Sequence, residues 1–163
     1  MTRAIRLELN GTEVAAVAEG GENLLSLLRG RLGDTSPKAG CLQGTCGACT
    51  VLVDGEPVVA CLMLAEAVDG RRVTTVRGLA DGPRLHPLQE AFMDGFAAQC
   101  GFCTPGMLMA AKALLDREPQ PTREQVIEAI AGNVCRCTGY TPIVDAILEA
   151  ARRMAGRRGR VEG

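Results

Sequence analysis

Eight cysteines, divided into two sets of four, constrain the fold of this chain more than any other feature. The first set has the spacing C-x4-C-x2-C-x11-C and comprises Cys41, Cys46, Cys49 and Cys61. The second set joins a C-x2-C pair to a later C-x-C pair and comprises Cys100, Cys103, Cys135 and Cys137. Because no thiol is left over, the sequence predicts two complete four-ligand sites.

The first set begins with the spacing of a plant-type [2Fe–2S] loop. Residues 40–49 carry three of its thiols on one short, glycine-containing segment, and Cys61 follows a predicted hairpin. Glycines let the backbone approach a cluster closely, so that N–H groups can donate to its sulfurs. Structural zinc is the alternative, but zinc sites favour two repeated C-x2–4-C pairs, which this triplet does not match. The sequence therefore predicts a [2Fe–2S] cluster here.

The second set is less specific, because C-x2-C followed by C-x-C could also hold zinc. Cys100 and Cys103 lie just before a predicted helix start at Thr104-Pro105. Cys135 and Cys137 lie in a turn between two predicted helices. Helix termini offer unpaired N–H groups and a dipole that favours an anionic cluster. Zinc binding remains an alternative at this site, but the position of the thiols at helix ends favours a second [2Fe–2S] cluster.

Composition excludes several classes of protein. The net charge of −1 predicts no general attraction to nucleic acid or to a membrane surface. No apolar run approaches the roughly 20 residues that span a bilayer. The first residues lead directly into an alternating strand pattern without a signal-peptide core, so we expect a cytoplasmic location, where thiols stay reduced. The only histidine, His86, rules out a Rieske site and is expected to start a helix or to pack.

Residues 1–80 carry the pattern of a β-grasp, ferredoxin-like domain. Asn10-Gly11 and Asp54-Gly55 each predict the turn of a β-hairpin. Between the hairpins, leucines at helical spacing predict one helix over residues 24–32, ended by Gly33. Residues 72–76 form the last predicted strand. This order of elements is that of a sheet wrapped over one helix.

Residues 81–163 carry a helical pattern instead, which makes the predicted fold class α+β. Four helices are expected, over residues 87–97, 104–116, from 122 onward and 141–154. Thr104 and Thr141 are each expected to be an N-cap before proline, and Thr122 forms a capping box with Gln125. We expect a linker over residues 78–83 and a short frayed tail after the last helix.

Two segments of the helical half resemble signatures of a known family. They are residues 99–106, QCGFCTPG, and residues 132–140, GNVCRCTGY. Together with the loop over residues 40–51, they are similar to the small iron–sulfur subunit of the molybdenum hydroxylases, the xanthine dehydrogenase and carbon monoxide dehydrogenase family. The resemblance extends from about Ile5 to Ala150. Residues 36–39 depart from the family's usual approach to the first cysteine, which bears on the shape of that loop.

The resemblance implies an electron-transfer subunit with two [2Fe–2S] clusters and no catalytic residue of its own. It implies a large partner subunit with molybdopterin, commonly the cytosine dinucleotide form, and a medium partner subunit with FAD, in a dimer of heterotrimers. The second-set cluster would lie next to the pterin and the first-set cluster toward the flavin. Gln99 and Cys137 match positions that contact the pterin, although Gln99 could equally be a surface amide. The substrate and the direction of electron flow stay open.

Two other functions are compatible with some of these features. A free-standing ferredoxin would also bind [2Fe–2S], but such carriers are usually small and strongly acidic, unlike this chain. A structural zinc protein that acts as an interaction module would use the same thiols without iron or labile sulfide.

Overall fold

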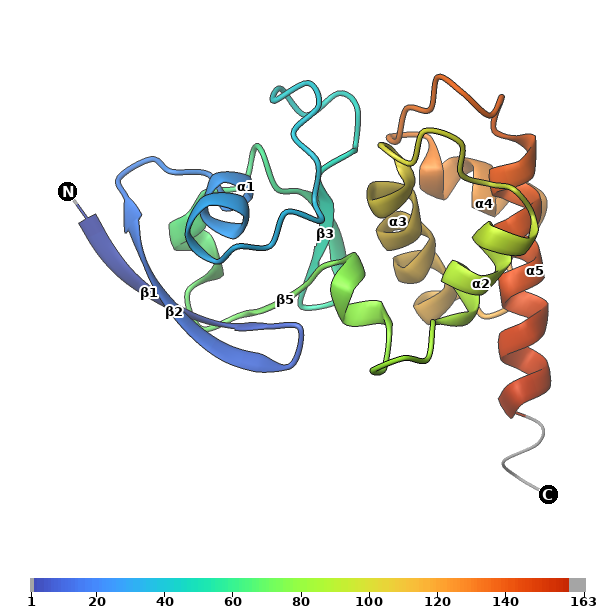
Figure 1. Cartoon of the computed structure of the whole chain (residues 1–163), viewed down its shortest axis with the longest axis horizontal. Coiled ribbons are helices and arrows are strands. Elements are labelled where there is room, and N and C mark those ends of the chain that lie inside the picture. The colour runs from blue at the N-terminus through green and yellow to red at the C-terminus, as the bar shows by residue number, and fades with distance from the viewer. Residues whose placement is uncertain (1, 159–163) are drawn as a thin grey trace.

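The computed structural model describes residues 2–158 and has two halves lying side by side (Figure 1). The N-terminal half contains a sheet with short helices, and the C-terminal half contains four longer helices. This arrangement confirms the predicted α+β class and the order of its two parts.

The sheet has five strands in the order β2-β1-β5-β3-β4. Their bounds are β1 (Thr2–Leu9), β2 (Thr12–Glu19), β3 (Thr50–Val53), β4 (Glu56–Val59) and β5 (Arg72–Thr74). β1 pairs with β5 in parallel, and the other neighbouring pairs are antiparallel. Both predicted hairpins are present, with Asn10 and Asp54 in the left-handed conformation at their turns. The β-grasp prediction is therefore confirmed.

The predicted helix over residues 24–32 is split in the structure. Its first part is α1 (Leu24–Ser26), and the rest is a π-helix, η1 (Leu27–Arg31). The Leu32 N–H donates to the carbonyl of Leu27 at 3.0 Å, which widens the last turn, and Gly33 then leaves the helix at φ 70°. Four leucines of this segment are buried in the core of the N-terminal half: Leu24, Leu25, Leu27 and Leu28.

β1 and the segment after β4 both contribute buried side chains to the core of the N-terminal half. Ile5 and Leu7 point inward from β1 and alternate with exposed neighbours, as the period of a strand requires. Cys49 and Cys61 belong to the same buried cluster. A 3-10 helix, η2 (Ala65–Val68), covers this cluster before β5 begins.

The four predicted helices of the C-terminal half are confirmed, with different ends. They are α2 (Pro87–Asp94), α3 (Thr104–Arg117), α4 (Arg123–Ile130) and α5 (Thr141–Arg158). α2 ends earlier than predicted because Gly95 caps it and Phe96 adopts a positive φ of 51°. α5 continues past residue 154, so the tail predicted to fray is helical up to Arg158, and residues 159–163 lie outside the described part. None of the helices within residues 2–158 combines the length and apolarity that a bilayer crossing requires.

The helix caps agree with the sequence at the starts of α2 and α4 and differ at the starts of α3 and α5. Thr122 and Gln125 form the predicted capping box of α4. His86 caps α2, since its side chain accepts a hydrogen bond from the Leu88 N–H at 3.1 Å. At α3 the prediction of Thr104 as the N-cap is wrong, because Cys103 occupies that position and Thr104 is the first helical residue. At α5 the prediction of Thr141 as the N-cap is wrong, because Thr141 is the first helical residue.

The two halves meet along β3 and α3. Leu52 of β3 packs with Met109 and Ala113 of α3 in a small cluster between the two main cores. A 3-10 helix, η3 (Val76–Leu79), shortens the predicted strand over residues 72–76 and overlaps the predicted linker over residues 78–83. The division at residue 80 into two domains stays a prediction.

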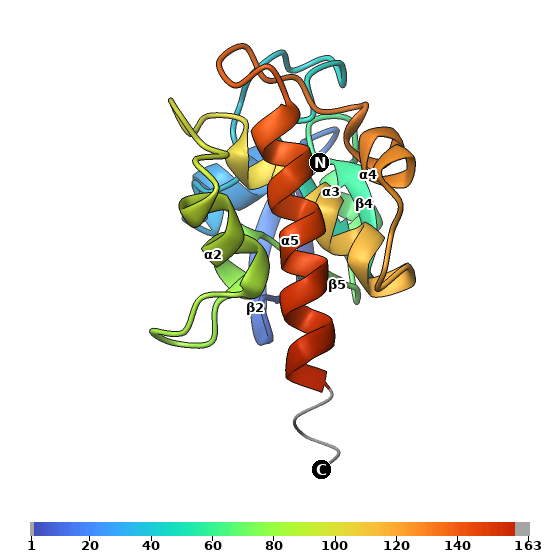
Figure 2. The same cartoon turned by 90° about the vertical axis from the view of Figure 1, so that its right-hand side faces the viewer.

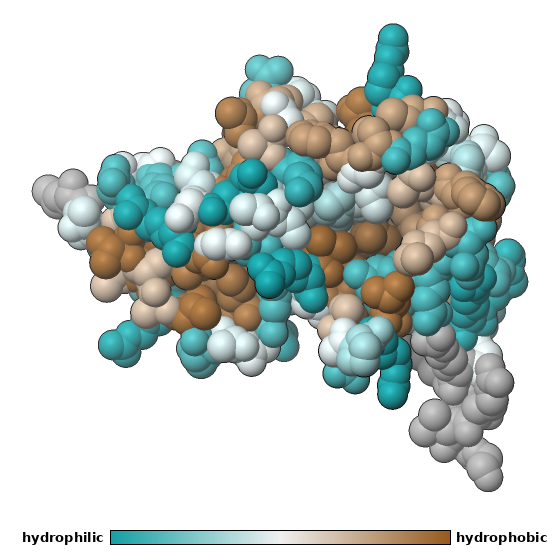
Figure 3. Space-filling view, in the orientation of Figure 1, coloured by the Kyte–Doolittle hydropathy of each residue, from teal (hydrophilic) through white to brown (hydrophobic). Residues whose placement is uncertain are grey.

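The loops that carry the cysteines gather at one end of the molecule. Figures 1 and 2 show the segment before β3, the segment between α2 and α3, and the segment between α4 and α5 at the same end. The end of α5 lies at the opposite end in both views. On the face seen in Figure 3, apolar areas occur over the left half and near the centre, with hydrophilic surface along much of the right-hand edge, where α5 lies.

Candidate metal centres

The first thiol loop turns tightly through residues 40–49. Leu42, Gly44 and Gly47 all adopt positive φ, at 56°, 80° and 67°. These turns direct backbone N–H groups at sulfur. The N–H groups of Thr45 and Gln43 donate to Cys41 Sγ at 3.3 and 3.5 Å. Such donors stabilise a thiolate and, in an iron–sulfur site, the added electron.

Close packing explains why glycine is needed in this loop. A Cβ atom on Gly40 would lie 2.8 Å from Cys46 Sγ, and the Cys41 N–H donates to that sulfur at 3.4 Å. A Cβ atom on Gly44 would meet only the movable, exposed end of Leu62, and there the positive φ of 80° is the reason for glycine. The space beside Gly40 is therefore filled by the Cys46 sulfur and cannot hold another side chain. This is the packing expected of a loop wrapped around a cluster.

The thiols of the first set differ in environment. A hydrogen bond from the Thr45 side chain, helped by the Gln43 N–H, lowers the pKa of the Cys41 thiol to about 6. Burial raises the pKa of Cys49 to about 11. Cys49 and Cys61 are buried, whereas Cys41 and Cys46 are half-buried. The site is thus anchored in the core on one side and reaches the surface on the other.

The second thiol set lies at the starts of two helices, as predicted. Cys103 occupies the N-cap position of α3, and Cys135 and Cys137 precede α5. The loop before α5 is held by Tyr140, whose hydroxyl accepts a hydrogen bond from the Cys135 N–H at 3.0 Å. Tyr140 has a φ of 70°, and Thr138 Oγ1 lies 3.2 Å from Cys135 Sγ. The Tyr140 and Thr138 side chains therefore hold the backbone and the thiol of Cys135 in place.

The thiols of the second set also differ in the direction in which their pKa values are shifted. Burial, followed by a hydrogen bond with Cys135, raises the pKa of Cys103 to about 12. At Cys100 the N–H of Phe102 lowers the pKa, and at Cys137 a hydrogen bond with Cys100 raises it. Cys100 and Cys137 are exposed, so this site opens to the surface more than the first one does.

The two thiol sets line one cavity of about 210 Å³. Its lining includes Cys41 and Cys46 from the first set and all four thiols of the second set. Phe102 and Val134 stand beside them. Within residues 2–158, no three Cys, His, Asp or Glu side chains are grouped as ligands of a single metal ion. All eight thiols are free. Thiols, N–H donors and tight glycines together fit [2Fe–2S] clusters.

The structure also brings together residues that sequence reasoning missed. The Val134 N–H donates to the carbonyl of Cys46 at 2.9 Å, and the side-chain amide of Asn133 donates to the carbonyl of Gly47 at 2.9 Å. These bonds join the two thiol loops directly. The sequence contained Asn133 within a recognised signature, but no pattern indicated that its amide would cross to the other loop.

Gln99, predicted from the family resemblance to contact a pterin, is exposed on the segment between α2 and α3. It directly precedes Cys100, so it lies at the rim of the second site. Its place on the surface is compatible with both a pterin contact and an ordinary surface amide.

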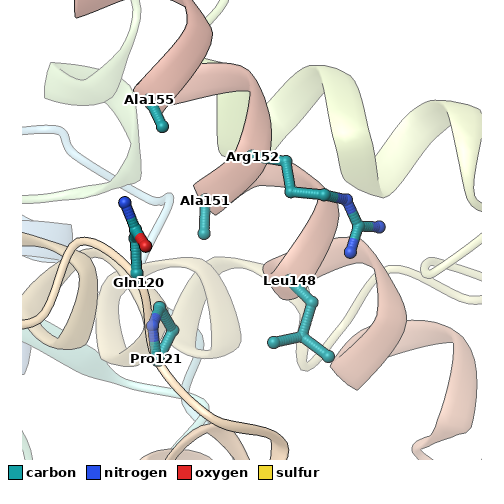
Figure 4. A pocket seen from close by; sticks show the side chains of 6 residues that line it. All are labelled: Gln120, Pro121, Leu148, Ala151, Arg152 and Ala155. Atoms are coloured by element: carbon teal, nitrogen blue, oxygen red, sulfur yellow. The ribbon is translucent and has the colours of Figure 1, made fainter.

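Another pocket lies away from the cysteines. A space of about 370 Å³ separates Gln120 and Pro121 from one side of α5 (Figure 4). The α5 residues that face it are Leu148, Ala151, Arg152 and Ala155. No thiol lines it, so it adds nothing to the metal chemistry.

Comparisons with known proteins agree with the two sites. A family model described as "2Fe-2S iron-sulfur cluster binding domain" matches residues 7–76, and one described as "[2Fe-2S] binding domain" matches residues 75–148. The nicotinate dehydrogenase small FeS subunit of Eubacterium barkeri is 48% identical over 93% of this chain and 96% of its own length. The xanthine dehydrogenase iron-sulfur-binding subunit of Escherichia coli O157:H7 is 43% identical over 93% of this chain and 96% of its own.

A solved structure agrees as well. One chain of quinoline 2-oxidoreductase from Pseudomonas putida 86 superposes with a TM-score of 0.92 and 44% identity, over 97% of this chain and 98% of that chain. The fold and the two thiol loops define an iron–sulfur protein of the electron-transfer class. This chain belongs to the small iron–sulfur subunits of the molybdenum hydroxylase, or xanthine dehydrogenase, family, in which partner subunits carry out the catalysis.

Proposed function

We propose that this chain relays electrons between a molybdopterin site on a large partner subunit and FAD on a medium partner subunit. Two [2Fe–2S] clusters, when bound, would each take up and give back one electron. The proposed ligands of the first are Cys41, Cys46, Cys49 and Cys61. The proposed ligands of the second are Cys100, Cys103, Cys135 and Cys137. Substrate chemistry belongs to the large subunit.

The observation that carries this proposal is the shared cavity. Thiols from both sets line it, although the sets are far apart in the sequence. Two redox sites that border one small cavity are close enough to exchange electrons inside the protein. A chain with one cluster and one remote structural site would not need this arrangement.

The exposure of the thiols supports an order of the two sites along the electron-transfer path, with the second site next to the pterin. Cys100 and Cys137 reach the surface, and Gln99 is exposed beside them. We therefore assign this rim to the pterin of the large subunit, with Gln99 and Cys137 as the contacting residues. The cytosine dinucleotide form of the pterin, the dimer of heterotrimers and the cytoplasmic location come from the family resemblance and are parts of the same proposal.

Apolar side chains around both loops support partner subunits. Leu42 and Leu62 are each 61% exposed beside the first loop, and Phe102 and Val134 are 49% and 53% exposed beside the second. Exposed apolar side chains grouped at a functional site are typical of interaction surfaces. A freely diffusing carrier has less reason to keep them at both sites.

Elemental analysis of the natively purified complex tests the proposal. We expect about four irons per copy of this chain, with acid-labile sulfide, and about one molybdenum in the co-purifying complex. Iron without molybdenum or partner subunits would favour a free-standing carrier. Zinc in place of iron would rule out both electron-transfer functions.

A further inference from the structure

The two thiol loops are joined at two neighbouring backbone carbonyls, those of Cys46 and Gly47, and a side chain reaches the second of them. The Nδ2 of Asn133 donates to it at 2.9 Å, and Asn133 is only 6% exposed. Gly47 directly follows Cys46, and Asn133 stands two residues before Cys135. One buried side chain therefore connects a ligand loop of the first site to a ligand loop of the second.

The backbone around the hydrogen bond between Asn133 and Gly47 is closely packed. A Cβ atom on Gly47 would lie 2.4 Å from the Gly132 carbonyl oxygen and 2.6 Å from Asn133 Nδ2. A Cβ atom on Gly106, in the first turn of α3, would lie 2.2 Å from the Gly47 carbonyl oxygen. The carbonyl is thus enclosed by the second thiol loop and by the helix that follows Cys103.

Two further donors, both from Thr50, make the Gly47 carbonyl part of a small network. The Thr50 N–H donates to this oxygen at 3.0 Å and the Thr50 hydroxyl at 2.7 Å. Asn133 Nδ2 also donates a longer bond, of 3.4 Å, to that hydroxyl. Thr50 belongs to β3 and therefore to the same half of the molecule as Gly47. Of these donors, only Asn133 comes from the second thiol loop. The Asn133 amide and the Thr50 hydroxyl can be removed separately, which makes the role of the crossing bond testable.

We infer that Asn133 is a positioning residue that sets the separation and orientation of the two cluster sites. The inference rests on the proposed function. Because electron tunnelling falls steeply with distance, a loop held by a buried hydrogen bond keeps the transfer rate uniform from molecule to molecule. The step is a one-electron exchange in which one site is oxidised as the other is reduced, with no bond formed or broken. Asn133 is not one of the proposed ligands and acts through the Gly47 carbonyl.

The first test measures the magnetic interaction between the two reduced sites in the complete complex, by electron paramagnetic resonance. Two paramagnetic centres split each other's signals, and the dipolar part of this splitting falls with the inverse cube of their separation. In Asn133→Ala we expect the splitting to become smaller or to spread over a range of values, because the loops are no longer held in one arrangement. The matched control is Thr50→Val, which removes the hydroxyl donor to the same carbonyl and the longer 3.4 Å bond from Asn133, and keeps the 2.9 Å bond from Asn133 to Gly47. It should keep the wild-type splitting.

The second test measures hydrogen exchange of the Val134 amide, which donates to the Cys46 carbonyl at 2.9 Å. We expect about tenfold faster exchange in Asn133→Ala than in the wild type, the effect of losing one buried hydrogen bond that supports the same contact. Thr50→Val keeps the Asn133–Gly47 bond and should accelerate this exchange less than Asn133→Ala does. If Asn133→Ala fails to assemble, Asn133→Asp keeps the volume, removes the donor and serves in both measurements.

The outcomes separate the inference from the function on which it rests. A wild-type complex that shows fewer than two iron–sulfur signals would contradict the proposed function itself. Two signals with unchanged splitting and unchanged exchange in Asn133→Ala would overturn the role of Asn133 alone. Equal changes in Thr50→Val would also overturn it, because the number of donors to the carbonyl would then matter rather than the link between the loops.

Discussion

Gly106 of α3 stands so close to Gly47 of the first thiol loop that a Cβ atom at position 106 would lie 2.2 Å from the Gly47 carbonyl oxygen. No real Cβ atom approaches a backbone oxygen this closely, so the N-terminal half and α3 can meet here only through glycine. The contact also places the helix that follows Cys103 against the loop that holds Cys46.

Replacing Gly106 by alanine should therefore destabilise the protein. The backbone of the thiol loop would have to move, and overpacking of this kind typically costs about 1–3 kcal/mol. Urea unfolding of the natively purified protein measures the change. Gly30→Ala is the matched control, because a Cβ atom on Gly30, in a helical segment, would meet nothing within 4 Å. The control should be neutral or slightly stabilising, and equal losses in the two variants would contradict the role of the contact.

Each thiol set should hold its iron independently of the other. Cys49→Ala removes a proposed ligand of the first site that is buried in the N-terminal core, and Cys103→Ala removes a proposed ligand of the second site, at the N-cap position of α3. Either variant should keep about two of the about four irons, since each [2Fe–2S] cluster needs four ligands. Iron analysis and the remaining electron paramagnetic resonance signal distinguish which site was lost. Loss of all iron in either variant would show that the two sites depend on each other.

Removal of iron should loosen the first thiol loop before the sheet. Metal binding contributes directly to folding free energy, and several N–H groups of residues 40–49 donate to sulfur. Protease treatment of the chelated and untreated protein compares the two states, with the cleavage sites identified by mass spectrometry. We expect the first new cuts within residues 40–49. First cuts within β1 or β5 would indicate instead that the clusters hold the sheet together.

The buried carboxylate of Asp34 should make stability depend on pH. Burial opposes its ionisation, but hydrogen bonds from Ser36 and Thr75 outweigh this and lower the pKa of Asp34. The Thr75 hydroxyl donates at 2.7 Å and the Ser36 N–H at 3.0 Å. A lowered pKa stabilises the folded state above the unfolded pKa of about 3.9, and the contribution is lost as the pH falls through the folded value.

Asp34→Asn should therefore cost about 2 kcal/mol at pH 7, as for hydrogen bonds to a charged group, and less as the pH falls below about 4. Urea unfolding of the cluster-free chain measures this, because acid releases the sulfide of iron–sulfur clusters. Asp54→Asn is the control, since Asp54 pairs with Arg71 at the surface and the loss should be smaller. A loss in Asp34→Asn that does not change between pH 7 and acid would contradict the charge-based explanation.

Local chemistry made much of the fold predictable. Asn10-Gly11 and Asp54-Gly55 specify tight hairpin turns, and Thr122 with Gln125 specifies a helix start, because each depends only on neighbouring residues. Where packing competes with local preference, the prediction was less accurate. The helix over residues 24–32 ends in a π-helical turn, and the cap of α3 is Cys103 rather than Thr104.

The spacing of the first cysteine set predicted a [2Fe–2S] site, because C-x4-C-x2-C is the plant-type spacing. The spacing of the second set left zinc as an alternative. Only the tertiary structure decided how the two sites relate. Asn133 and Gly47 are far apart in the sequence, and their hydrogen bond forms because α3 and β3 pack and bring the two loops to one cavity. Spacing along the chain encodes the ligands of a site, whereas the distance between two sites arises from the packing of the cores that carry them.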